Sequence, residues 1–299
     1  MLHSYQRYTA AGNTFIVMNT REHPLSLAQG EMRMLVQKAC DRLEGIGSDG
    51  LILINESSSA PFRMDYYNPD GSTGMLCGNG SRCAVEAARA FGFVAGKETD
   101  FEVLGAINHA ELLANNSVRV HFQDPSEILL NISVALEDDR SVRAHYVDVG
   151  SQHIVVFFDE LKNFGETNIE EMNVAHFGKL LRWHPNFAPL GANANFIQAR
   201  ADGEEQYLRI RTFERGVEAE TLACGTGCMS SAIAAYLTNC VTSLPIRLLT
   251  QSGEYVSVNF HADGSHISNL SLEGPVVAGE QGTFEFSEAT GSFRIIDVS

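Results

Sequence analysis

The chain has 299 residues, of which 44% are hydrophobic and 19% are charged, a composition typical of a folded globular protein. Its formal net charge of −16 at pH 7 argues against nucleic acid and anionic membranes as partners. The first residues lack the apolar core of a signal peptide, and no apolar run approaches the roughly 20 residues that span a bilayer. We therefore expect a cytoplasmic protein with one large domain or two ordinary ones.

In the first half of the chain, short apolar runs bounded by turn residues predict strands, and helical spacing of apolar residues predicts two helices. The expected strands are residues 14–18, 51–54, 62–67 and 117–122, and the expected helices are residues 31–43 and 80–91.

The second half continues in the same way, and strands again outnumber helices. Most connections resemble hairpins rather than a regular alternation of strand and helix, so we predict an α+β fold with largely antiparallel sheets. The expected strands are residues 145–149, 154–158, 195–198, 208–213 and several from 246 onward, and the expected helices are residues 170–183 and 226–238.

An internal repeat organises these elements. Cys77-Gly78-Asn79-Gly80 opens one helix and Cys224-Gly225-Thr226-Gly227 opens another, with Asn68 and Arg215 each nine residues before the cysteine. Both helices are rich in small apolar residues, and the second carries no charge from Cys228 to Cys240, so it should be buried within a sheet. We expect two similar halves, with a boundary near residues 123–130.

The Cys-Gly-x-Gly step suits a particular chemistry. Glycines let the backbone approach a ligand, and the first N–H groups of a helix can bind an anion. The positive end of the helix dipole lowers the pKa of a nearby thiol. If a carboxylate is held between two such helix ends, one thiolate can remove a Cα proton while the opposite thiol protonates the other face. Charge on the enolate-like intermediate must then be stabilised by the same N–H groups.

Simpler interpretations apply to cysteines taken singly, because a lone cysteine is usually a small buried hydrophobe. We expect Cys40, Cys83, Cys228 and Cys240 to pack in the core, and all six thiols to be reduced. The spacings Cys-x5-Cys and Cys-x3-Cys do not resemble zinc knuckles, so no metal is expected. A cysteine–histidine pair involving His153 would leave the second Cys-Gly-x-Gly step unexplained.

Several motifs together carry a family resemblance. The chain resembles the diaminopimelate epimerases, isomerases of lysine and peptidoglycan biosynthesis that use no pyridoxal phosphate. The strongest matches are Asn68-Pro69-Asp70-Gly71-Ser72 through Met75-Leu76 to Cys77-Gly78-Asn79-Gly80-Ser81-Arg82-Cys83, and Phe213-Glu214-Arg215-Gly216 through Glu220-Thr221-Leu222-Ala223 to Cys224-Gly225-Thr226-Gly227. Weaker matches are Gly12-Asn13-Thr14-Phe15, residues 45–50, Gly191-Ala192-Asn193-Ala194-Asn195-Phe196 and Leu272-Glu273-Gly274-Pro275.

The resemblance implies two pseudo-symmetric domains, each a barrel-like sheet around a central helix, with the active site between them. The expected domains are residues 1–125, completed by about 280–299, and residues 126–279. It also implies a homodimer, a small-molecule substrate, diaminopimelate, and no cofactor.

The resemblance assigns roles residue by residue. Cys77 and Cys224 would be the acid/base pair, and His153 and Glu214 would tune their pKa values. The reacting carboxylate would bind the N–H groups of Gly78, Asn79, Gly225 and Thr226; the rest of the substrate would contact Asn13, Asn68, Ser151, Asn193, Glu214 and Arg215. Taken alone, Asn68 suits a turn cap, Glu214 and Arg215 a solvated pair, and His153 an ordinary packed histidine.

One departure concerns substrate recognition. Family members usually have Gly-Asn-Pro-His where this chain has Gly150-Ser151-Gln152-His153. The asparagine would contact substrate, whereas the shorter Ser151 would act through water or a shifted loop. The change of the usual aspartate to Thr14 in Gly-Asn-Asp-Phe is minor.

Three alternatives stay open. A two-cysteine racemase of proline or hydroxyproline would usually have histidine where Asn79 stands, but an epimerase of broader specificity fits Ser151. A catalytically silent amino-acid-binding protein would have no reason to retain both cysteines. A dithiol redox protein would use Cys77 and Cys224 as an oxidisable pair.

Overall fold

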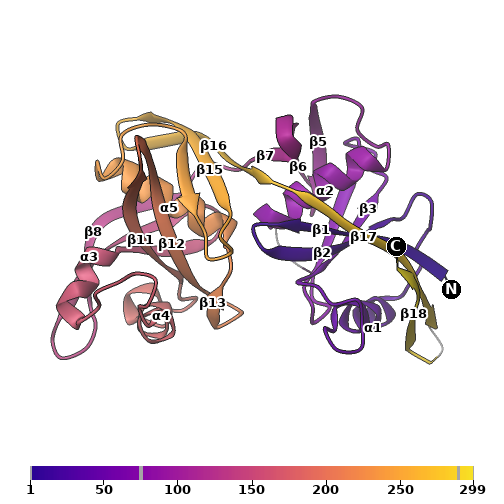
Figure 1. Ribbon diagram of the computed structural model, residues 1–299, viewed down its shortest axis with the longest axis horizontal. Coiled ribbons are helices and arrows are strands. Elements are labelled where there is room, and N and C mark those ends of the chain that lie inside the picture. The colour runs from indigo at the N-terminus through magenta and orange to yellow at the C-terminus, as the bar shows by residue number, and fades with distance from the viewer. Residues whose placement is uncertain (1, 74–76, 288–289, 299) are drawn as a thin grey trace. The chain divides into compact units, whose positions relative to one another are not determined.

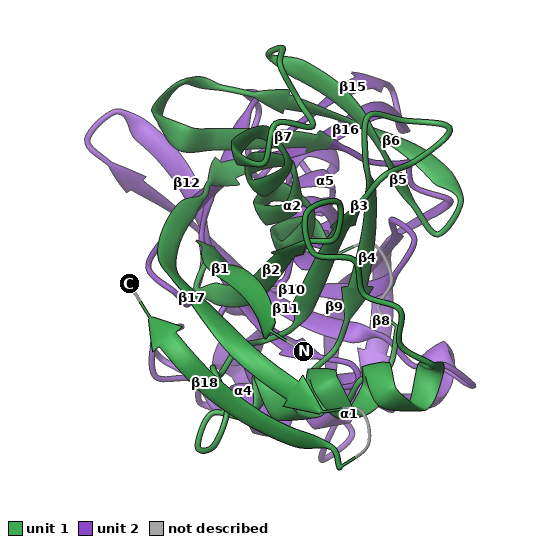
Figure 2. Cartoon of the chain, turned by 90° about the vertical axis from the view of Figure 1, so that its right-hand side faces the viewer, with its two compact units in different colours: residues 1–120, 274–299 green, residues 121–273 purple. Residues whose placement is uncertain are grey.

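The computed structural model describes residues 2–73, 77–287 and 290–298 (Figure 1). Contacts divide the chain into two compact units, residues 1–120 with 274–299 and residues 121–273 (Figure 2). This division differs from the expected domain limits in two segments. Residues 121–125 belong to unit 2 rather than to the N-terminal half, and residues 274–279 belong to unit 1 rather than to the C-terminal half. Within the described residues, no helix is long and apolar enough to cross a membrane.

Within the described residues, unit 1 contributes nine strands, and all but two of their neighbouring pairs are antiparallel. Only β2 with β3 and β4 with β5 run parallel. The strands, in spatial order, are β18 (Ser292–Val298), β17 (Val277–Ser287), β1 (Leu2–Ala10), β2 (Asn13–Asn19), β3 (Leu51–Asn55), β4 (Arg63–Tyr67), β5 (Glu98–Val103), β6 (Ala106–Leu112) and β7 (Ser117–His121).

Unit 2 is built from the remaining strands, and two of its pairs, β10 with β11 and β12 with β14, are parallel. The strands, in spatial order, are β8 (Glu127–Ala135), β9 (Ser141–Asp148), β10 (Gln152–Phe157), β11 (Asn193–Asp202), β12 (Glu205–Glu214), β14 (Ile246–Leu249), β15 (Tyr255–Asp263) and β16 (His266–Pro275), with the short β13 (Ala219–Thr221) beside the end of β12.

The two units repeat one pattern of strand pairing. Starting from the β17–β1 pair in unit 1 and the β8–β9 pair in unit 2, the directions run antiparallel, antiparallel, parallel, antiparallel, parallel, antiparallel, antiparallel in both. In each unit, the connection between the second pair of parallel strands contains a central helix. This helix is α2 (Gly78–Ala90) between β4 and β5, and α5 (Gly225–Leu237) between β12 and β14. The predicted α+β fold with two similar halves is confirmed.

The central helices are enclosed by the strands of their own units, as Figure 1 shows. Helix α2 packs against β1, β2, β3, β4 and β6, while α5 packs against β9, β10, β11, β12, β14 and β15. Helix α5 is buried along most of its length, from Gly227 to Ala235. This burial confirms the prediction from its uncharged sequence, because a helix that is apolar all round gains stability only when every face leaves water.

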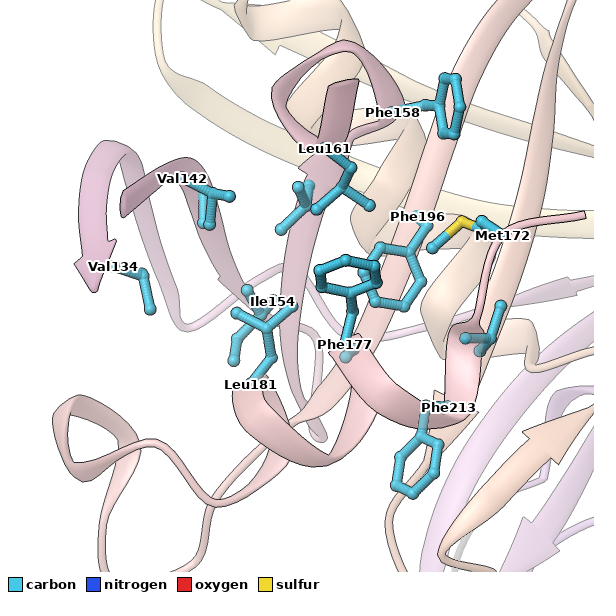
Figure 3. Close-up of a cluster of buried hydrophobic side chains, with 14 of the residues drawn as sticks. Val134, Val142, Ile154, Phe158, Leu161, Met172, Phe177, Leu181, Phe196 and Phe213 are labelled. Atoms are coloured by element: carbon cyan, nitrogen blue, oxygen red, sulfur yellow. The ribbon is translucent and has the colours of Figure 1, made fainter. Parts of the chain in front are cut away.

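Outer helices cover the other faces of the sheets. In unit 1, α1 (Gln29–Cys40) covers a core that includes Ile16, Leu51 and Phe284. In unit 2, α4 (Val174–Arg182) supplies Phe177 and Leu181 to a core that also contains side chains from β8 to β12 and from the segment after β10 (Figure 3). The short α3 (Phe158–Leu161) and three 3₁₀ turns, Ala114–Asn116, Lys162–Phe164 and Pro185–Phe187, join the larger elements.

Helix ends differ from the sequence prediction for local reasons. Helix α1 ends three residues early because Asp41 turns the chain, its Oδ1 accepting the Leu43 and Glu44 N–H groups at 2.7 and 2.9 Å. Helix α4 starts late because Asn173 caps it, accepting the His176 N–H at 3.1 Å.

The sequence prediction also missed several strands and misplaced one cysteine. Strand β1 was not predicted, because its sequence contains many polar side chains and its positions are a mixture of buried and half-buried ones. Strands β5, β6 and β8 were missed as well. Cys40, Cys83 and Cys228 are buried as expected, but Cys240 is only half-buried, because it follows the end of α5 and lies outside the enclosed helix.

Candidate active site

Cys77 is the N-cap residue of α2, with an extended backbone at φ −98° and ψ 115°. Its Sγ accepts the Gly80 N–H at 3.5 Å, so the thiol satisfies one of the helix's unpaired donors. The residue is half-buried. Met75 and Leu76, which belong to the motif before it, lie outside the described residues.

The N-terminus of α2 is held by a polar network within unit 1. Asn79 is 3% exposed; its Nδ2 donates to Asn13 Oδ1 at 2.7 Å, and its Oδ1 accepts from Arg82 Nη2 at 3.0 Å. Arg82 also donates to Gly78 O at 3.4 Å and is fully buried. The structure thus brings Asn13, Gly78 and Asn79 together. Arg82 was quoted in the motif but given no role, and its buried positive charge lies one turn from the N-terminus of α2.

Asn68 lies in the turn that follows β4. Its backbone N–H donates to Ser72 O at 2.9 Å, and its Nδ2 donates to Ser72 Oγ at 3.0 Å. Gly71, with φ of +78°, donates to Asn68 O at 2.8 Å. Asn68 therefore has the turn-capping contacts that its position before Pro69-Asp70-Gly71 indicates.

Cys224 is the N-cap residue of α5, again in an extended conformation, with φ −121° and ψ 114°. It is 8% exposed, and its Sγ lies 3.4 Å from Thr226 Oγ1. A Cβ added at Gly227 would collide with Asn195 Oδ1, so this helix start approaches β11 too closely for any side chain at that position.

Burial dominates the protonation of Cys224 and Glu214. It raises the pKa of the Cys224 thiol well above its ordinary value; the neighbouring Glu214 carboxyl adds to the rise, and the Thr226 hydrogen bond opposes it. This direction is opposite to that expected from the helix dipole alone. Although Glu214 as a residue is only partly buried, its carboxyl group is enclosed, and desolvation raises its pKa too.

Three substrate-binding candidates in unit 2, Ser151, Asn193 and Arg215, belong to one hydrogen-bonded group. Asn193 Nδ2 donates to Ser151 Oγ at 3.1 Å and to Gln152 O at 2.9 Å, while its Oδ1 accepts the Arg215 N–H at 2.8 Å. Arg215 Nη1 donates to Gln152 Oε1 at 2.7 Å. Gln152 was named in the sequence only as a departure from the family pattern, and its side chain is part of this group.

His153 is fully buried and bonded to a residue that sequence reasoning did not single out. Its Nδ1 lies 3.0 Å from Asn195 Nδ2, and Asn195 Oδ1 accepts from Thr212 Oγ1 at 3.0 Å. Burial, followed by the Arg215 charge, lowers the pKa of His153 to about 3, while the Asn195 hydrogen bond opposes this shift. His153 is therefore neutral near pH 7 and accepts through Nδ1. The signal for Asn195 was the alternation Asn193-Ala194-Asn195, which directs both amides to one face of β11.

The described residues contain no group of three or more His, Cys, Asp or Glu side chains able to hold a metal ion. Each unit instead offers a cysteine at a helix N-terminus, with backbone N–H groups beside it and amide side chains supporting the neighbouring strands. Such an arrangement can bind a carboxylate and exchange a proton through sulfur.

A family model described as diaminopimelate epimerase matches residues 5–127 and 145–278 of the chain. The chain belongs to this family. It is 37% identical over 276 residues to a diaminopimelate epimerase of Chlorobaculum tepidum, covering 92% of this chain and 98% of the relative. It is 36% identical over 269 residues to one of Aquifex aeolicus, covering 87% and 90%.

Solved structures extend the likeness at the level of the fold. A phenazine biosynthesis protein of the PhzF family from Bacillus anthracis matches with a TM-score of 0.71 and 17% identity, covering 95% of this chain and 99% of that one. The architecture of the diaminopimelate epimerase family is therefore shared by proteins with very different sequences.

Proposed function

We propose that the protein interconverts LL- and meso-diaminopimelate by moving a proton at Cα between two cysteines. Membership in the family makes the chain an isomerase, an epimerase of lysine biosynthesis. The observation that supports this mechanism is one local arrangement that occurs in both units. Each unit has a cysteine as the N-cap of its central helix, followed by a glycine whose N–H belongs to the first turn.

In the proposed reaction, the substrate carboxylate binds the N–H groups of Gly78, Asn79, Gly225 and Thr226. One sulfur, as thiolate, removes the Cα proton, and the other, as thiol, protonates the opposite face, so no cofactor is needed. Charge that develops on the carboxylate is stabilised by the two helix ends. The raised pKa of Cys224 favours its thiol, the form that delivers a proton.

The remaining substrate contacts are assigned in the same proposal. Arg215 suits the distal carboxylate, since a guanidinium can donate two parallel hydrogen bonds to it. Glu214 faces the substrate ammonium and, with neutral His153, sets the electrostatic surroundings of Cys224. Asn13, Asn68, Ser151 and Asn193 complete the binding group. We further propose a cytoplasmic homodimer.

A second candidate is an epimerase or racemase of broader amino-acid specificity. It is favoured by Ser151, whose side chain is shorter than the usual asparagine and whose Oγ already accepts a hydrogen bond from Asn193. A catalytically silent amino-acid-binding protein, or a redox protein that uses the two cysteines as a dithiol, would have the same fold but would not epimerise an amino acid. These alternatives differ in substrate range and in solvent exchange, which one experiment measures.

The test is to incubate the reduced protein in deuterium oxide with LL-diaminopimelate and, separately, with several other L-amino acids. The Cα proton is followed by NMR. The proposal expects meso product and deuterium at Cα for diaminopimelate alone, and a loss of at least about 10³-fold in Cys77→Ala and Cys224→Ala. Full activity in either variant, or epimerisation without solvent deuterium, would reject the two-cysteine mechanism. Exchange confined to another amino acid would change the substrate, and no exchange at all would favour the binding protein.

A further inference from the structure

The side chain of Gln152 occupies an unusual place beside the proposed distal-carboxylate site. It is the first residue of β10, where the family pattern has a proline without any side-chain donor or acceptor. Its Oε1 accepts from Arg215 Nη1 at 2.7 Å, and its Nε2 donates to Asp148 Oδ2 at 3.0 Å. Gln152 therefore links a cation and an anion through a neutral amide.

The orientation of this amide is determined by its two partners. A carboxylate only accepts and a guanidinium only donates, so reversing the amide would break both bonds. Asp148 is itself held, since its Oδ1 accepts the Gly150 N–H at 2.9 Å and its backbone is paired with Gln152 in the β9–β10 ladder. The chain Asp148–Gln152–Arg215 is thus charge-assisted at both ends, which strengthens each hydrogen bond.

The same link leaves the charge of Arg215 unneutralised. No carboxylate of this chain forms an ion pair with Arg215 among the residues that the structure describes, and its side-chain partner is an amide oxygen. The Arg215 backbone N–H is fixed separately, through Asn193, whose amide also holds Ser151 Oγ. Arg215 is therefore positioned at its backbone and at its guanidinium while its remaining N–H groups keep their full attraction for a carboxylate.

We propose that Gln152 is a positioning residue for recognition of the distal carboxylate, and that Ser151 and Gln152 act as a compensating pair. The resemblance assigns a substrate contact to the asparagine that Ser151 replaces, and Gln152 offsets its loss by holding the Arg215 guanidinium ready for the carboxylate. This inference rests on the proposed function. It makes the site selective for an amino acid with a carboxylate at its far end.

The variant Gln152→Ala tests the positioning role through the split between KM and kcat. Because Gln152 acts at the distal end, KM for diaminopimelate should rise by about five- to thirtyfold while kcat changes by less than about twofold. Gln152→Glu should raise KM further, since its carboxylate would neutralise Arg215 and repel Asp148. The thermal midpoint of each variant is measured alongside.

A matched control is available in the same unit. Gln198 Oε1 accepts from Arg200 Nε at 3.1 Å, so Gln198→Ala removes a glutamine–arginine bond away from the proposed site and should leave KM unchanged. The compensation is tested by Gln152→Pro, which should raise KM, and by Ser151→Asn with Gln152→Pro, which should restore it to within about threefold of the wild-type value.

The outcomes separate this inference from the proposed function. Wild-type turnover with an unchanged KM in Gln152→Ala would overturn the role of Gln152 and leave the epimerase intact. A KM that rises equally in Gln152→Pro and in the double variant would overturn the compensation. If the wild-type protein itself did not turn over diaminopimelate, the proposed function would fail and this inference with it.

Discussion

At the scale of single residues, the two Cys-Gly-x-Gly steps are alike in sequence but not in their surroundings. Cys77 is half-buried and its Sγ accepts a backbone N–H, whereas Cys224 is 8% exposed and its Sγ contacts the Thr226 hydroxyl. Burial disfavours a thiolate and raises the pKa of the Cys224 thiol, a direction that the motif shared with Cys77 does not indicate.

The last glycine of each step gives a matched pair of substitutions. An added Cβ at Gly227 would collide with Asn195, while at Gly80 it would meet Cys77, Ile52 and Met64 at 3.5 Å, an ordinary contact. We expect Gly227→Ala to lower the free energy of unfolding by about 1–3 kcal/mol through overpacking. We expect Gly80→Ala to be neutral or to stabilise by about 0.5–1 kcal/mol, because alanine favours helix.

Urea unfolding of both variants measures this difference. A loss of stability in Gly80→Ala equal to that in Gly227→Ala would show that the close approach to Asn195 is not what excludes a side chain at Gly227.

At the scale of secondary-structure elements, buried arginines in unit 2 hold the turn that carries Arg215. Arg182 pairs with Glu218 at 3.1 Å, and Arg211 forms a bidentate pair with Glu220 at 2.6 Å for both bonds. Arg211 is 7% exposed and also donates to three carbonyls of the segment before α4, those of Ile169, Glu170 and Met172. One side chain thus joins β12, β13 and the segment that precedes α4.

Removing that side chain should leave both a carboxylate and three carbonyls without their donor. We expect Arg211→Ala to lower the free energy of unfolding by about 3–5 kcal/mol, the cost of breaking a buried ion pair. Arg211→Lys should recover only part of this, since an ammonium cannot reproduce the fork of the guanidinium.

The matched control is Arg143, which pairs with Glu160 at 2.7 Å but is exposed. Arg143→Ala should cost no more than about 1 kcal/mol. Equal losses in the two alanine variants, measured by urea unfolding, would contradict the assignment of Arg211 as the buried link.

Most elements were predictable because their pattern is local. The strand at residues 51–54 is an apolar run, residues 208–213 alternate apolar and polar side chains, and the helices at Cys77 and Cys224 begin at glycine steps. Strand β1 was not predictable in this way, because its place as a strand depends on backbone pairing with β2 on one side and β17 on the other. Asn195 and Arg82 lie in motifs of the sequence but were given no role there, since their hydrogen bonds join them to residues that only the folded chain brings close.

At the scale of the whole molecule, two buried neutral histidines make stability depend on pH. Burial first, and then the Arg143 charge, lowers the pKa of His145 to about 4, and the pKa of His153 is lowered to about 3. The unfolded chain binds protons at these sites near the ordinary pKa of 6.5, whereas the folded chain does not. The free energy of unfolding is therefore greatest above pH 6.5 and falls as the pH is lowered toward 4.

Each group contributes a slope of up to about 1.4 kcal/mol per pH unit in this window. We expect His145→Gln to flatten the fall of the thermal midpoint between pH 6.5 and pH 4, with the remaining slope due in part to His153. His261→Gln, at an exposed position, is the control variant. A slope identical in wild type and His145→Gln would show that His145 does not become protonated on unfolding.

The sequence by itself determined the chemistry that each half can offer. Cysteine, glycine and helix-forming residues in order are enough to place a thiol beside free N–H groups, because this depends only on contacts within one turn. It also determined the α+β class and the burial of α5, since both follow from hydrophobic patterning.

Only the tertiary structure decided how the site residues are held and how they ionise. The contacts of Arg215 with Gln152 and Asn193 join residues far apart in the chain, and no local pattern encodes them. The raised pKa of Cys224 and the lowered pKa of His153 depend on desolvation, which exists only once the sheet has closed around them. The repeat of strand directions likewise appears only in the paired sheet, because hydrogen bonding between distant strands defines it.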